Sequence, residues 1–197
     1  RVLHNLKVTN QIMDKNQPKP VKHSQTTITE LMIPSYANFG GKIHGGILLS
    51  LMDKVAFACA TKHSSNYCVT VSVVGVEFLQ PVEVGDLVSL LASVNYVGRS
   101  SMVIGIRVIA ENVKLGVVKH TNTSYFTMVA KDENDKPTPV PPLLLEDKEE
   151  VKRFIEAMQM REIEGSIKEK LNDVKSRTEV DRATEILKGQ RCVIAYQ

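Results

Sequence analysis

The segment from residue 47 to residue 63 restricts the possible folds more than any other part of the sequence. Its apolar side chains recur at the spacing of an α-helix, and further apolar residues fill most of the other helical faces. The first set is Ile47, Leu48, Leu51, Met52, Val55, Ala56 and Cys59, and the second is Leu49, Phe57, Ala58 and Ala60. A helix with this pattern is expected to be buried on nearly every face. One face of a sheet cannot cover such a helix, so we expect a second copy of the chain to supply the remaining contacts.

Five other segments have the composition of β-strands. Residues 25–33 are rich in β-branched side chains and are followed by a proline. The other four follow the helix and are Cys68–Leu79, Asp86–Val97, Ser100–Val113 and Val117–Lys131. We expect a bulge at Gly75, and antiparallel pairing of consecutive strands because the turns between them are short. The order predicts an α+β fold, in which the helix packs on an antiparallel sheet.

The charge distribution separates the C-terminal part of the chain from the rest. Residues 146–188 contain 10 Lys/Arg and 12 Asp/Glu, and the proline-rich segment 137–145 precedes them. We therefore predict an N-terminal arm (1–22), a main domain (23–136), an extended linker (137–145) and a charged helical extension (146–197). In the extension, Gly165 is expected to end a first helix, and the capping pattern from Ser166 to Glu169 to begin a second. The pair is expected to cover part of the sheet or of a subunit surface.

Composition excludes several classes of protein. No apolar run approaches the ~20 residues that span a bilayer, and residues 1–22 contain no apolar core of a signal peptide. A cytoplasmic protein outside any membrane is therefore expected. Three cysteines without paired spacing predict neither a disulfide framework nor a metal site. The net charge of +3 is scattered and the aromatic content is 5%, so no nucleic-acid partner is expected.

The loop before the apolar helix and its first turns hold the candidate functional residues. Gly45 and Gly46 stand where the helix begins, and free N–H groups there can stabilise an oxyanion, although a plain flexible loop is the alternative. Asp53 lies within the most apolar helix, which favours a functional role over a carboxylate paired with a lysine on the surface. His44 is either a base or a residue that bonds to the backbone. Asn38 either caps a turn or orients a water molecule or a carbonyl.

These residues resemble the motif of a known family. Residues 38–53 are similar to the pattern Asn-x-x-Gly…His-Gly-Gly…Met-Asp of the acyl-CoA thioesterases of the hotdog superfamily. Val69–Val71, Val76–Asp86 (the F-x-x-P-V-x-x-G-D turn) and Gly98–Met102 (G-R-S-S-M) are similar to later segments of that family. Four matching segments in the same order and spacing are a specific signal. The resemblance covers roughly residues 25–140.

The resemblance implies a hotdog fold, in which a curved antiparallel sheet wraps a long central helix. It also implies a homodimer with the two sheets joined edge to edge, often assembled into trimers of dimers, and active sites at the dimer interface. The implied reaction is the hydrolysis of fatty acyl-CoA to a free fatty acid and coenzyme A. Coenzyme A is then part of the substrate, and no separate cofactor is expected.

The resemblance also implies a role for each site residue. Gly45 and Gly46 hold the thioester oxygen, and Asp53 is a general base or a nucleophile that forms a mixed anhydride. Asn38 comes from the facing subunit, and Thr70 shares the attacking water. Strand alternation is expected to place Thr70, Ser72 and Val74 on one face of the sheet. Some relatives carry an aromatic residue at the position of His44.

Coenzyme A also requires a contact for its phosphates. The resemblance implies that Arg99, Ser100 and Ser101 supply it, with Arg99 on a phosphate; a hairpin turn with a solvent-facing arginine is the alternative. Two other functions stay open. A hydroxyacyl-thioester dehydratase would carry Asp-x-Asn-x-x-His or a His-Phe-Pro-Gly loop, and the sequence has neither. A non-catalytic acyl-CoA sensor that binds DNA would need a helix-turn-helix, for which residues 1–24 are too short.

Overall fold

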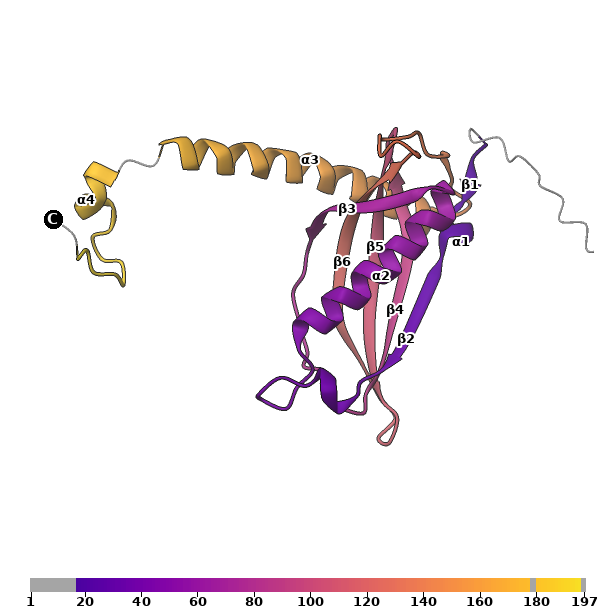
Figure 1. The fold of residues 1–197 in the computed structure, drawn as a ribbon, viewed down its shortest axis with the longest axis horizontal. Helices are drawn as coiled ribbons and strands as arrows, with labels where there is room; N and C mark the ends of the chain where they lie inside the picture. The colour runs from indigo at the N-terminus through magenta and orange to yellow at the C-terminus, as the bar shows by residue number, and fades with distance from the viewer. Residues whose placement is uncertain (1–16, 178–179, 196–197) are drawn as a thin grey trace, which may run out of the picture. The chain divides into compact units, whose positions relative to one another are not determined.

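A five-stranded antiparallel sheet wraps one side of a long helix in this computed structural model, which describes residues 17–177 and 180–195 (Figure 1). The helix is α2 (Gly45–Ser64). The five strands are β2 (Thr26–Leu31), β3 (Tyr67–Val74), β4 (Leu87–Val97), β5 (Ser101–Asn112) and β6 (Val117–Lys131). The predicted α+β architecture and its central helix are therefore confirmed. Residues 1–16 of the predicted N-terminal arm lie outside the described residues.

Several short elements surround this core. They are β1 (Lys19–Pro20), α1 (Val21–Ser24), the 3₁₀ turn η1 (Pro34–Tyr36) and β7 (Leu143–Leu144). Strands β1 and β7 pair parallel in a separate two-stranded sheet. The proline-rich segment packs against the end of α2, where the ring N–H of buried His63 donates to the Pro141 carbonyl at 2.8 Å. Burial lowers the pKa of His63, so the neutral ring is favoured at this contact.

The core lies between α2 and the concave face of the sheet. Alternate residues of β5 point toward the helix because side chains of a strand alternate between its two faces. Met102, Ile104 and Ile106 are buried in this way, and they share one apolar cluster with Met52 and Val55 of α2. The apolar side chains that recur about every 3.6 residues in α2 and every 2 residues in the strands therefore pack together in a single core.

The strand order differs from the expected order at one strand. The sheet runs β2-β4-β5-β6-β3, so β4, β5 and β6 pair consecutively as predicted, but β3 pairs with β6 rather than with β4. Strand β3 ends at Val74, five residues before the predicted end, and the chain then crosses to β4. Polar groups of β6 hold the crossing segment, because Asn122 Nδ2 donates to the Glu77 carbonyl and Ser124 Oγ to the Gly75 carbonyl. The expectation that all consecutive strands pair was wrong at this connection.

Helix α2 is not buried on every face within a single chain. Leu49, Asp53 and Phe57 recur at intervals of four residues and lie on one exposed face. Leu49 and Phe57 each expose 39% of their surface. The prediction of burial on nearly every face was therefore wrong for one chain alone. That a second copy covers this face stays a prediction.

The charged extension contains one long helix where two were expected. Helix α3 runs from Lys148 to Arg177 and passes through Gly165 without a break. Glycine in a helix interior costs only ~1 kcal/mol relative to alanine, so one glycine among good helix formers does not end a helix. The short elements η2 (Val180–Arg182) and α4 (Ala183–Ile186) follow. Contacts divide the chain into two units, one ending at Ala157 and one beginning at Met158.

No helix among the described residues is long and apolar enough to cross a bilayer.

Candidate active site

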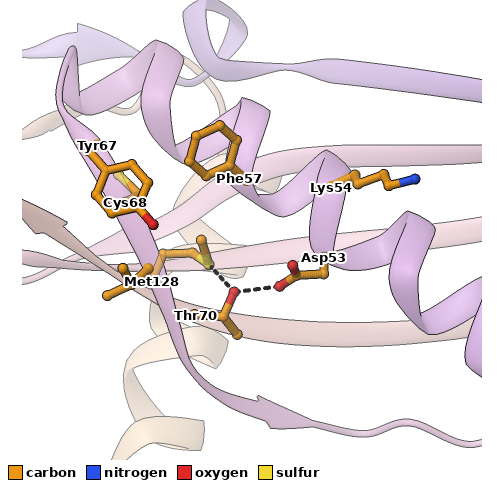
Figure 2. A pocket seen from close by; sticks show the side chains of 8 residues that line it. Asp53, Lys54, Phe57, Tyr67, Cys68, Thr70 and Met128 are labelled. Carbon is orange, nitrogen blue, oxygen red and sulfur yellow. Dashed lines mark hydrogen bonds between the residues drawn. The ribbon is translucent and has the colours of Figure 1, made fainter.

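Asp53 and Thr70 meet beside a pocket between α2 and β3 (Figure 2). The Thr70 hydroxyl donates to Asp53 Oδ1 at 2.5 Å and lies 3.2 Å from the sulfur of Met128. A hydroxyl has one proton, and a carboxylate accepts it far better than a thioether does. The proton is therefore directed to Asp53, and Met128 is a packing contact. This pair was expected from the resemblance, and the structure brings both residues together.

A bulge in β3 directly after Thr70 interrupts the alternation of the strand. The pairing with β6 shifts between Thr70 and Ser72, so Thr70 faces Met128 whereas Ser72 faces Thr127. Directly opposed residues of a sheet point to the same face, and adjacent residues of β6 point to opposite faces. Thr70 and Ser72 therefore lie on opposite faces of the sheet, which contradicts the expected common face. The bulge stands at residue 71 rather than at Gly75.

The N-terminus of α2 is capped by His44. Its Nδ1 accepts from the Gly46 N–H at 2.9 Å, so Nδ1 is unprotonated in this arrangement. Gly45 occupies the first helical position, for which an α-helix provides no internal acceptor. A Cβ on Gly45 would lie 3.1 Å from the ring of Phe78, so any larger residue there would push this ring aside. One of the two expected oxyanion donors, the Gly46 N–H, therefore already has a partner.

Replacing His44 with Ala should affect the helix end more than the chemistry. Loss of an N-cap costs ~0.5–2 kcal/mol, and the Gly46 N–H becomes available to substrate. We expect a lower melting temperature with a loss of turnover well below that of an Asp53 variant, measured by thermal unfolding and thiol release. A loss of turnover as large as that of the Asp53 variant would make His44 a catalytic residue.

Asn38 lies apart from the Asp53–Thr70 pair and caps its own turn. Its Oδ1 accepts from the backbone N–H of Gly40 at 2.9 Å and of Lys42 at 3.2 Å. The loop it organises leads directly into the N-terminus of α2. The structure therefore places Asn38 with the helix end and Asp53 in the middle of the helix.

Arg99 and Ser100 stand in the turn between β4 and β5, and Ser101 begins β5. Arg99 is exposed, and its carbonyl accepts from the Val140 N–H at 2.9 Å. Ser101 pairs with Val129, which in turn pairs with Val69. The turn therefore lies two strands, or ~10 Å, from β3 within one chain. Within one chain, Arg99 has the geometry of a solvent-facing turn residue.

The pocket itself has a volume of about 350 Å³ and contains residues that the sequence analysis did not assign to a site. Its lining is Asp53, Lys54, Phe57, Tyr67, Cys68, Val69, Thr70 and Met128. Burial raises the pKa of the Cys68 thiol, so this cysteine stays protonated and does not compete with Asp53 as a nucleophile. The position of Phe57, one helical turn after Asp53, was a signal available in the sequence. Within the described ranges, no three His, Cys, Asp or Glu side chains gather to hold a metal ion.

Comparison with known proteins places the chain in a family. The model of the thioesterase superfamily matches residues 40–117. Protein VdlD of Helicobacter pylori is 46% identical over 133 residues, which cover 68% of this chain and 76% of that protein. A crystal structure of an apo-hexameric acyl-CoA thioesterase has a TM-score of 0.74 and is 36% identical, covering 76% of this chain and 96% of the other.

An acyl-CoA hydrolase from Staphylococcus aureus adds a match at the site. Its complex with butyryl-CoA, coenzyme A and coenzyme A disulfide has a TM-score of 0.73 and is 28% identical, covering 80% of this chain and 96% of the other. Alanine variants of one Asn, one Asp and one Thr of that protein have been solved. Its Asp follows the Asn by 15 positions and precedes the Thr by 17, the same intervals that separate Asn38, Asp53 and Thr70. The chain thus belongs to the thioesterase superfamily, among its hotdog-fold acyl-CoA thioester hydrolases.

Proposed function

We propose that this chain hydrolyses fatty acyl-CoA, with Asp53 as the general base or nucleophile at a site that two copies complete. The observation that carries the proposal is the Thr70–Asp53 hydrogen bond beside a pocket. It orients the carboxylate and leaves its second oxygen free to take a proton from water or to attack the thioester. The equal spacing of the Asn, Asp and Thr in the Staphylococcus aureus enzyme supports the choice of residues.

The need for two copies follows from the length of the helix. Gly45 and Asp53 are eight positions apart in the sequence, so at ~1.5 Å per residue they lie ~12 Å apart along the axis. A reacting carbonyl must lie within ~3 Å of its oxyanion donors and of the attacking group. One chain therefore cannot bring both to the same thioester. We place Asp53 and Thr70 of one copy opposite Asn38 and the Gly45 end of α2 from a facing copy.

The free edge of β3 offers a route to this arrangement. Strand β3 is at one end of the sheet order, so one side of its backbone is unpaired within the sheet. Unpaired strand edges readily add a strand from another chain. Joining β3 to β3 would bring two copies of the exposed α2 face together. We propose a homodimer, with a trimer of dimers as the full assembly, in a cytoplasmic location.

In this site, the helix end stabilises the developing negative charge. The Gly45 N–H has no intrahelical acceptor, and the helix dipole adds positive potential. The Gly46 N–H joins it only when the His44 ring turns away. Asn38 supports the loop that leads to this helix end, and its amide N–H₂ can orient the thioester or the water. Loss of one oxyanion donor typically costs 10²–10³ in rate.

The direct test is the release of free thiol from acyl-CoA by the purified chain. Hydrolysis that depends on Asp53 is expected. Binding of acyl-CoA without thiol release would instead indicate a non-catalytic sensor. Conversion of a hydroxyacyl-CoA to its enoyl product, with the thioester intact, would indicate a dehydratase.

Arg99, Ser100 and Ser101 are proposed to hold the nucleotide of coenzyme A. Arg99→Ala should raise KM for acyl-CoA more than it lowers kcat, because a phosphate contact is made in the ground state and transition state alike. The effect should shrink for an acyl-pantetheine, which lacks the nucleotide, and should weaken with salt. Measuring kcat and KM for acyl-CoA and for the acyl-pantetheine at two ionic strengths tests these expectations. An equal loss on both substrates would assign Arg99 to the fold or to an interface.

A further inference from the structure

The pocket beside Asp53 has a polar end and an aromatic end. Asp53 and Thr70 form the polar end. At the other end, Phe57 of α2 meets Tyr67 of β3 edge-on, with ring centroids 5.9 Å apart and planes at 60°. Figure 2 shows the two rings close together, apart from the Asp53–Thr70 pair. Such tilted contacts are a favoured geometry for aromatic pairs, so the two rings form one continuous aromatic wall at this end of the pocket.

The rest of the lining is suited to an aliphatic chain. Met128 and Cys68 also line the pocket, with Met128 beside Thr70 and Cys68 beside Tyr67. The sulfur of Met128 contacts the Thr70 hydroxyl, and the protonated Cys68 thiol behaves as a small apolar group. A flexible methionine can adapt to chains of different shape. Substrate-binding pockets are typically apolar with a few polar groups at the reacting end, as here.

The distance between the ends limits what fits. Phe57 lies one helical turn, or ~6 Å, beyond Asp53, and Tyr67 lies three strand residues, or ~10 Å, from Thr70. An extended hydrocarbon with C–C bonds of ~1.5 Å advances ~1.3 Å per carbon. The space therefore admits roughly five to eight carbons.

We propose that Phe57 and Tyr67 set the maximum acyl chain length of this enzyme, and that its preferred substrates are short to medium acyl-CoA thioesters. This inference rests on the proposed function, because it requires the thioester to lie at Asp53. The acyl chain runs from the Asp53–Thr70 pair toward the ring pair, and longer chains collide with the rings. Both rings are specificity-determining residues and take no part in the chemistry.

Phe57→Ala should extend the range of substrates. We expect the ratio of kcat/KM for dodecanoyl-CoA to that for butanoyl-CoA to rise by about 10-fold or more, since one or two methylene groups in an apolar pocket typically change kcat/KM by this much. Thiol release from a series of butanoyl- to hexadecanoyl-CoA measures the profile. Tyr67→Ala should change it in the same direction, and Tyr67→Phe, which keeps the ring, should retain the wild-type profile.

Leu49→Ala is the matched control. Leu49 exposes the same 39% of its surface as Phe57, and it lies one turn from Asp53 in the opposite direction on the same helix face. Any effect of losing an apolar side chain from this face is shared by the two variants. Of these two variants, only Phe57→Ala is expected to shift the preferred chain length.

Two results would overturn the inference while leaving the hydrolase intact. One is a wild-type preference for hexadecanoyl-CoA over hexanoyl-CoA, and the other is an unchanged profile in Phe57→Ala and Tyr67→Ala. Failure of the proposed function is different, because the wild type would then release no thiol at any chain length. In that case the Asp53→Asn variant still decides the inference, since its dissociation constants for the same acyl-CoA series should weaken beyond about eight carbons and recover when Phe57→Ala is added.

Discussion

Asp53→Asn is expected to lower thioester hydrolysis by ~10²–10⁴-fold, the usual contribution of a general base. The amide keeps the size of the side chain and can still accept the Thr70 hydroxyl, but it cannot take a proton from water or attack a thioester. Asp53 is exposed within the chain, so the substitution should change the melting temperature little. Turnover by thiol release and thermal unfolding, measured on the same preparation, separate the two effects.

The same chemical change at a remote position provides the control. Asp173→Asn alters a surface residue of α3 whose ion pair with Arg177 is exposed, and turnover should stay at the wild-type level. Near wild-type turnover of Asp53→Asn would exclude Asp53 as base and as nucleophile. The proposed mechanism would then be wrong.

Mixing two inactive variants should restore activity if each site draws on two copies. Asn38→Ala and Asp53→Asn alone are both expected to be severely impaired. In a heterodimer of the two, one site carries both substitutions and the other carries neither, because a two-fold axis relates the copies. Random assembly makes about half of the dimers mixed, so co-expression should recover about a quarter of the wild-type sites. The measurement is turnover per mole of chain, with each variant alone as reference.

The control for this experiment is a chain that carries both substitutions, co-expressed with wild type. If each site draws on two copies, every mixed dimer has one substituted residue in each of its two sites, so only about a quarter of the wild-type sites stay intact, all in wild-type homodimers; sites within one chain would leave about half. If co-expressed single variants regain no activity although mass spectrometry finds mixed dimers, both residues serve a site within one chain. A single-chain site is difficult to reconcile with the ~12 Å between Gly45 and Asp53.

Most of the secondary structure could be predicted from local patterns. The predicted strand Val117–Lys131 matches β6, and the predicted β4 and β5 differ from the observed bounds by one residue at most. Hydrophobic periodicity depends only on residues near one another in the chain, so it indicates a helix or a strand whatever the arrangement of the elements in space. Gly165 shows the limit of local signals. Its cost of ~1 kcal/mol is small beside the propensity of a 30-residue helix.

Strand order depended on contacts that no local pattern contains. The short turn predicted between Leu79 and Asp86 favoured a hairpin of the two strands on either side of it. In the structure, α2 separates β2 from β3 and delivers them to opposite edges of the sheet. Side chains of β6, among them Asn122 and Ser124, then bind the crossing segment. Those hydrogen bonds join residues 45 and 49 positions apart, which is beyond any turn or helix period.

The candidate site divides in the same way. The sequence by itself determined the helix, its glycine N-terminus and Asp53 within it, because motif spacing and periodicity depend only on the order of nearby residues. Only the tertiary structure decided that Thr70, 17 residues away, reaches Asp53, and that Phe57 and Tyr67 pair beside the adjoining pocket. The physical reason is that these contacts join α2 to β3, whose place in the sheet depends on its pairing with β6, and no local pattern along the chain contains that pairing.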